Sequence, residues 1–187
     1  MDFSTNRRLA VIILIIVICV FTLVGVNRSL SALASDISKG FYDGVYNDSE
    51  GYLEKSIQSH LNNRIDAANG MITMDVPAAS DELDALRQAR YALMNGETVK
   101  DKYEANVLLT ECSERAYEAL TASSLTDEQA TMLGHYISTL RSADKAIEKL
   151  SYNDKVDEFY NKTLKTFPVS AFRVLISVDG PEYFGEN

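Results

Sequence analysis

An uncharged stretch near the N-terminus constrains the fold of this 187-residue chain most strongly. The run from Leu9 to Val26 reads LAVIILIIVICVFTLVGV and contains no charged residue. As a helix rising about 1.5 Å per residue, it would cover about 27 Å, close to the roughly 30 Å hydrocarbon core of a bilayer. A helix also satisfies its own backbone hydrogen bonds in lipid. We therefore expect residues 9–26 to be a transmembrane anchor that contacts the lipid bilayer.

The same region also has features of a removable signal peptide, because a basic segment and an apolar run precede the small residues Ala32-Leu33-Ala34. The apolar region of a signal peptide is usually about 7–15 residues long, which is shorter than this run. Arg28 also separates the run from the possible cleavage site after Ala34. A retained anchor is the preferred interpretation, and cleavage is the alternative.

The basic residues that flank the apolar run predict its orientation. Arg7 and Arg8 precede the run, whereas Arg28 is the nearest basic residue after it. By the positive-inside rule, residues 1–8 form a cytoplasmic tail, and the chain from about residue 27 onward lies outside the cytoplasm.

The chain beyond the anchor has the composition of one acidic domain. Its roughly 160 residues suffice for a single domain with a core of its own. The formal net charge of −9 argues against nucleic-acid partners, which require a basic surface. Cys112 is the only cysteine outside the apolar run, so no intramolecular disulfide can form there. Packing must stabilise this domain, and we expect Cys112 to be buried.

Apolar residues in the rest of the chain recur at the three- and four-residue spacing of amphipathic helices. Residues 27–51 are expected to hold a juxtamembrane helix and then a glycine-rich bend at 41–51. The aromatic residues of this bend are expected to pack on the bundle or to lie at the membrane interface; they are Phe41, Tyr42 and Tyr46. The spacing then predicts long helices over about 52–74, 80–95, 99–122 and 126–150, followed by an extension from 152 toward 167.

Capping signals support two of these helix starts. Ser80 is followed by acidic residues and is a predicted N-cap, and Thr126 with Gln129 is a predicted capping box. The expected fold is therefore all-α, with an N-terminal transmembrane helix followed by an antiparallel bundle of about four long helices. The bundle and a C-terminal tail occupy residues 52–187.

The C-terminal third carries a pattern of aromatic residues and asparagines. The pattern consists of Tyr152-Asn153, Val156, Tyr160-Asn161, Phe167-Pro168 and Tyr183-Phe184. Buried asparagine side chains need hydrogen-bond partners, and we expect neighbouring helix ends and the tail backbone to supply them. The preferred interpretation is that these residues latch Phe167-Pro168 and the tail onto the bundle. The alternative is a partner-binding surface, because Tyr is enriched in interface hot spots.

This pattern resembles the C-terminal signature of the LemA family of bacterial membrane proteins. A second point of resemblance is Leu61-Asn62-Asn63-Arg64-x-Asp66, which adds Arg64 and Asp66 to the motif residues. The chain departs from the family pattern at Asn69-Gly70, where members usually have a proline-containing apolar stretch. The resemblance implies a single-pass protein of the bacterial cell membrane with an extracytoplasmic helical bundle and no established catalytic centre.

The sequence contains no spacing typical of a catalytic or metal site. The Glu-x-x-His pair of carboxylate-bridged bundles is absent before both His60 and His135. We therefore expect no catalytic residues, no metal site and no cofactor. The leading hypothesis is an interaction or scaffold module that binds another envelope protein or itself. The alternative is a binder of a small ligand or envelope polymer, and a hydrolase that uses His60 or His135 is less favoured.

Overall fold

The computed structural model describes residues 7–186 and confirms the expected all-α fold. The α-helices are α1 (Arg7–Asp43), α2 (Ile57–Ile72), α3 (Ser80–Asn95), α4 (Val99–Thr121), α5 (Asp127–Ile147), α6 (Tyr152–Asn161) and α7 (Val169–Phe172). Two 3-10 helices, η1 (Pro77–Ala79) and η2 (Thr163–Lys165), and two strands, β1 (Tyr46–Asn47) and β2 (Tyr52–Leu53), complete the described secondary structure. Residues 1–6 of the predicted cytoplasmic tail lie outside the described residues.

Helix α1 contains the apolar run and continues through the predicted juxtamembrane helix. Within the described residues it is the one helix that is long and apolar enough to cross a membrane, with a mean hydropathy of 3.4 in an 18-residue window. None of that window is buried. A membrane anchor and a signal sequence both have these properties.

The described chain forms two compact units. The first contains residues 7–38 and 154–181, and the second contains residues 39–153 and 182–186. Residues 154–181, which include most of α6, therefore belong to the same unit as the apolar helix. The last residues of the tail belong to the unit that contains the bundle.

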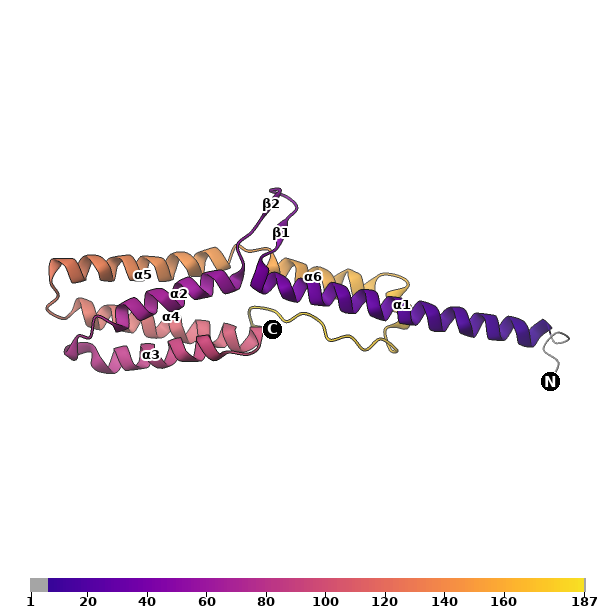
Figure 1. Cartoon of the computed structure of the whole chain (residues 1–187), viewed down its shortest axis with the longest axis horizontal. Helices are drawn as coiled ribbons and strands as arrows, with labels where there is room; N and C mark the ends of the chain where they lie inside the picture. The colour runs from indigo at the N-terminus through magenta and orange to yellow at the C-terminus, as the bar shows by residue number, and fades with distance from the viewer. Residues whose placement is uncertain (1–6, 187) are drawn as a thin grey trace. The chain divides into compact units, whose positions relative to one another are not determined.

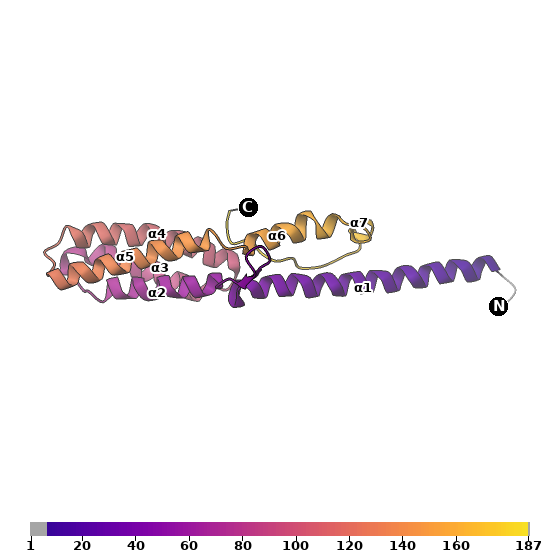
Figure 2. The same cartoon turned by 90° about the horizontal axis from the view of Figure 1, so that it is seen from above.

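The second unit is built on the four-helix bundle that the sequence predicts. Helices α2, α3, α4 and α5 lie side by side in both views (Figures 1 and 2). Helix α2 packs against α3 and α5, and α4 packs against the same two helices. Short connections make successive helices antiparallel. The largest fully buried apolar side chains of the four helices are Ile57, Leu61, Met71, Leu86, Leu93, Leu109, Leu120 and Leu140.

The predicted helix starts are confirmed in one case and wrong in the other. Thr126 Oγ1 accepts a hydrogen bond from the Gln129 backbone N–H at 3.2 Å, and Gln129 Oε1 accepts one from the Thr126 N–H at 2.9 Å. Ser80 is instead the first residue of α3, and no side chain caps this helix. The reason is that η1 leads directly into α3, so the Ser80 N–H already donates to the Pro77 carbonyl.

The first unit has a small core of its own. Leu30 and Ala34 of α1 pack with Phe159 of α6. Partly buried apolar side chains surround these three and come from α1, α6, η2, α7 and the tail; they are Val26, Ile37, Tyr160, Leu164, Val169, Ile176 and Val178. In this unit the C-terminal chain therefore folds back on itself and packs along α1.

Candidate functional site: the tyrosine hairpin

The segment predicted as a glycine-rich bend contains a small β-hairpin in the second unit. Strands β1 and β2 are antiparallel, with Tyr46 opposite Leu53 and Asn47 opposite Tyr52. The Asn47 side-chain oxygen accepts hydrogen bonds from the backbone N–H groups of Ser49 at 3.0 Å and Glu50 at 3.2 Å in the turn. We call residues 44–54 the tyrosine hairpin. Figure 1 shows it standing out from the start of α2.

The hairpin and the helix end before it expose four large apolar or aromatic side chains. Between 48% and 62% of each is exposed: Tyr42, Tyr46, Tyr52 and Leu53. A two-stranded hairpin with no second layer cannot bury both of its faces, because successive side chains point to opposite sides. The expected packing of Tyr42 and Tyr46 on the bundle is therefore wrong, whereas their alternative place at the membrane interface stays a prediction. The helix expected from about residue 52 begins at Ile57, and Leu53 lies in β2. Phe41 is buried, as expected.

A buried carboxylate fastens this hairpin to the beginning of α6. One Glu54 oxygen accepts a hydrogen bond from the Ser151 backbone N–H at 2.8 Å. The other accepts from Ser151 Oγ at 2.8 Å and from Asn47 Nδ2 at 2.7 Å. Burial alone would raise the pKa of Glu54, but these hydrogen bonds outweigh it and hold the pKa below its usual value. The ionised carboxylate thus connects both strands to residue 151.

The hairpin also requires a glycine where the chain leaves α1. Gly44 has a φ of +94°, in the region that favours glycine, and a Cβ there would collide with the Glu54 carbonyl oxygen. The Glu54 N–H donates to the Val45 carbonyl at 2.9 Å at the same crossing. The hairpin geometry therefore depends on residues 44 and 54 together.

The motif residues Tyr152, Asn153 and Phe184 form an aromatic cluster beside this anchor. Phe41 lies between them, with ring centroids 5.8 Å from Tyr152 and 5.7 Å from Phe184. Asn153 Nδ2 donates to the Phe184 carbonyl at 3.0 Å, and the Phe184 N–H donates to Asn153 Oδ1 at 3.1 Å. The expectation that an asparagine of the motif bonds to the tail backbone is confirmed at Asn153. Tyr183, the residue before Phe184, is partly buried.

The remaining motif residues of α6 lie in the first unit. Val156 is buried, and Tyr160 donates its hydroxyl to the Pro181 carbonyl at 3.1 Å. Asn161 is exposed, and its amide contacts Asp157 one turn earlier at 3.4 Å rather than the tail.

Phe167 and Pro168 do not dock as expected. Helix α6 ends at Asn161, and after η2 the Phe167 side chain is 79% exposed while Pro168 is partly buried. The expectation that Phe167-Pro168 is latched onto the bundle is wrong, because both residues lie in the first unit, beyond the end of the helix that would have carried them.

Arg64 is a structural residue within the bundle. Its side chain is 1% exposed, and its Nη1 lies 2.6 Å from Asp144 Oδ1 and 3.1 Å from the Leu140 carbonyl oxygen. Its Nη2 donates to Thr110 Oγ1 at 2.6 Å. Burial lowers the pKa of Arg64, and the nearby carboxylates oppose that shift. Arg64 thus connects α2 with α4 and α5, whereas Asp66 is exposed.

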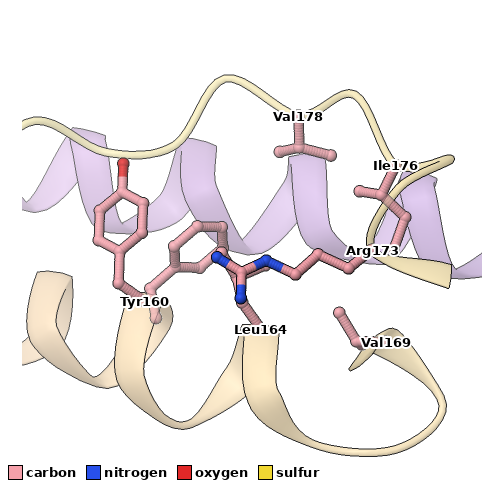
Figure 3. A pocket seen from close by; sticks show the side chains of 7 residues that line it. Tyr160, Leu164, Val169, Arg173, Ile176 and Val178 are labelled. Atoms are coloured by element: carbon pink, nitrogen blue, oxygen red, sulfur yellow. The ribbon is translucent and has the colours of Figure 1, made fainter. Parts of the chain in front are cut away.

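The first unit contains a shallow cavity of about 160 Å³. Figure 3 shows Tyr160 and Leu164 on one side of it and Ile176 and Val178 on the other, with the Arg173 side chain between them. Pockets that hold drug-sized ligands are usually about 300–1,000 Å³. The cavity is therefore small for an organic ligand.

The two histidines lie on different helices of the bundle. His60 on α2 is half-buried, and burial with the nearby Lys55 lowers its pKa, whereas His135 on α5 is exposed. Among the described residues, no group of three or more His, Cys, Asp or Glu side chains is arranged to hold a metal ion.

The tyrosine hairpin was not recognisable from the sequence. Its strands are two residues long, so they carry no alternating pattern, and Glu54 reads as an ordinary polar residue before a helix. Comparisons with protein-family models, curated proteins and solved structures give no match.

Proposed function

We propose that this chain is a membrane-anchored, LemA-like interaction module that binds a protein partner in the bacterial cell envelope through its tyrosine hairpin. Helix α1 would be the retained anchor, with the N-terminus in the cytoplasm and the helical body outside. The observation that carries the proposal is a hairpin that exposes Tyr46, Tyr52 and Leu53 while the buried Glu54 carboxylate holds its base.

The residue types favour a protein partner. Tyrosine presents a large amphipathic surface with only two side-chain torsions, so little conformational entropy is lost when it binds. Tyrosines are also enriched among the residues that dominate interface energies. The three hydrogen bonds of Glu54 hold the hairpin in place before binding, which lowers the cost of ordering it in a complex.

The charges around the hairpin indicate the chemistry of the partner. Asp48 and Glu50 lie within the hairpin and Asp43 directly precedes it, and all three are exposed. The Glu50 carboxylate is hydrogen-bonded to the Tyr52 phenol and raises its pKa. The complementary surface would have an apolar pocket for the exposed side chains and a basic rim around it.

The ligand-binding alternative has less support. The cavity in the first unit is about 160 Å³ and is lined mostly by apolar side chains. This volume suits a few water molecules or one short side chain better than a polymer segment. We therefore place the interaction at the hairpin rather than at the cavity.

Site-specific photo-crosslinking in intact cells tests this proposal. A photoreactive amino acid would replace Tyr46 in the full chain, and a second variant would carry it at Tyr91 on α3. The two positions are matched, since 54% of Tyr46 and 51% of Tyr91 is exposed. We expect a discrete crosslinked protein band from position 46 that is absent from position 91. Equal bands from both positions, or none from position 46, would refute a hairpin interface.

A further inference from the structure

Three of the four most exposed large apolar side chains in the described chain belong to one loop of the first unit. They are Phe167 (79%), Val174 (98%) and Leu175 (68%), and the fourth, Phe21 (74%), lies in the apolar run of α1. We call residues 166–175 the C-terminal loop. The exposure of this loop is comparable to that of the segment expected to face lipid.

The C-terminal loop is held against α1. Leu164 before α7, Val169 within it and Ile176 after it all pack around the core that α1 and α6 form. Val26 belongs to the same cluster, and it is also the last residue of the apolar run. The loop therefore lies where α1 would leave the hydrocarbon core.

The two sides of the C-terminal loop differ in the residues that cover them. On the inner side, Val169 and Ile176 line the small cavity with residues of α6 and the tail (Figure 3). On the outer side, nothing in the described first unit covers Phe167, Val174 or Leu175. Val169 and Ile176, which lie between or next to these exposed residues in the chain, pack in the same cluster as Val26, the last residue of the apolar run. A bilayer that receives α1 would therefore end near the loop.

The charge of the segment also suits a membrane surface. The loop itself contains one basic residue, Arg173, and no acidic residue. Lys165 lies directly before it and Lys162, which pairs with Glu158 at 3.4 Å, one turn earlier, although the chain as a whole carries −9. Basic side chains near a bilayer are attracted to anionic headgroups, and their long stems allow the charge to stay in the headgroup region while the apolar part is buried.

We infer that the C-terminal loop is a second membrane contact, which inserts Phe167, Val174 and Leu175 into the headgroup and acyl-chain boundary of the leaflet from which α1 emerges. This inference rests on the proposed role of α1 as a membrane-spanning anchor. An anchor held at two points cannot rotate freely about its own axis. The contact would therefore restrict the orientation of the first unit at the membrane surface.

The absence of tryptophan from the chain makes a direct test possible. Three variants of the full chain would each carry a single tryptophan: Phe167→Trp in the loop, Phe21→Trp in the anchor and Tyr91→Trp in the bundle. All three positions are exposed, so the substitutions need no space in a core. Each protein would be reconstituted into vesicles of phosphatidylcholine and phosphatidylglycerol. The measurements are the emission wavelength and the quenching by lipids brominated on their acyl chains.

We expect the emission of Phe167→Trp to be blue-shifted relative to Tyr91→Trp and to be quenched by the brominated lipids, though less than that of Phe21→Trp. Emission of Phe167→Trp that is neither shifted nor quenched, while Phe21→Trp is quenched, would overturn the loop contact and leave the anchor intact. A blue shift without quenching would also overturn it, because a second copy or a partner protein would then cover the loop. Absence of quenching at Phe21→Trp would refute the anchor itself.

Discussion

Removal of Asp144 should destabilise the bundle more than removal of its partner Arg64. In Asp144→Ala, the guanidinium of Arg64 stays buried and keeps two neutral acceptors, the Leu140 carbonyl at 3.1 Å and the Thr110 hydroxyl at 2.6 Å, while Glu114 is the one carboxylate whose charge still acts on it. Breaking a buried ion pair in this way costs about 3–5 kcal/mol. Because about one third of Asp144 is exposed, we expect a loss of about 3 kcal/mol, at the lower end of that range.

The reciprocal substitution, at Arg64, should destabilise the bundle less, because the carboxylate that it leaves without a partner is not fully buried. In Arg64→Met, Asp144 keeps contact with water and a hydrogen bond from Asn106 Nδ2 at 3.3 Å. The methionine fills most of the space, and the Thr110 hydroxyl still donates to the Asn106 carbonyl at 3.1 Å. Loss of one partner is costly when it leaves a buried charge, whereas here the carboxylate left behind is partly solvated, so we expect a loss of about 1 kcal/mol or less. The double variant should then be more stable than Asp144→Ala alone.

The buried thiol of Cys112 provides the assay. Cys112 lies on α4 and is 3% exposed, so it reacts only when the bundle opens. In a Cys19→Ser background it is the single thiol of the chain, and its labelling rate in increasing urea reports the free energy of opening of the detergent-solubilised protein. If Arg64→Met cost as much as Asp144→Ala, or if the losses simply added in the double variant, the reasoning about a stranded buried charge would be refuted.

Four further predictions concern the hairpin, helix α5 and the tail. Gly44→Ala should release the hairpin and accelerate amide exchange over residues 45–54, and unchanged exchange there would contradict the structure. Gly134 in α5 has open space around it, so Gly134→Ala should raise the free energy of unfolding by about 0.5–1 kcal/mol in the labelling assay, and a loss of stability would contradict the structure. The lowered pKa of Glu54 means that its anchoring is present at neutral pH and is lost as the pH falls through that pKa, so the Ser151 amide NMR signal should shift at a pH below the usual carboxyl value of about 4.3, and Glu54→Gln should abolish that shift. Phe184→Ala should free the tail at a cost of about 3 kcal/mol, measured as roughly hundredfold faster proteolysis after residue 180 with Cys112 still protected; unchanged cleavage would show that the aromatic cluster does not hold the tail.

The helices were predictable from the sequence because each buries one stripe of side chains against its neighbours. Residues such as Leu133, Ile137 and Leu140 recur at helical spacing, and all three are buried. Capping chemistry is equally local, and the Thr126 box forms as predicted. The Ser80 prediction failed because it ignored the 3-10 turn that precedes the helix.

Most of the candidate site could not be predicted because it depends on pairs far apart in the chain. Glu54 meets Ser151 across 97 residues, and no local pattern marks either partner. The motif predicted that an asparagine would bond to the tail, but it could not distinguish Asn153, which does so, from Asn161, which bonds within its own helix. Arg64 was singled out only by resemblance, and its burial against Asp144 depends on the register of two packed helices.

The central claim, that the tyrosine hairpin is the partner-binding surface, is tested most directly by an affinity measurement. The protein captured by crosslinking from position 46 would be purified, and its Kd measured for the full chain in detergent with Tyr46→Ala and, as the matched control, Tyr91→Ala. An interface hot spot costs about 2 kcal/mol or more when truncated, so we expect Tyr46→Ala to weaken binding at least about tenfold. Tyr91→Ala should leave the Kd unchanged. An unchanged Kd for Tyr46→Ala, or an equal loss in both variants, would contradict the account.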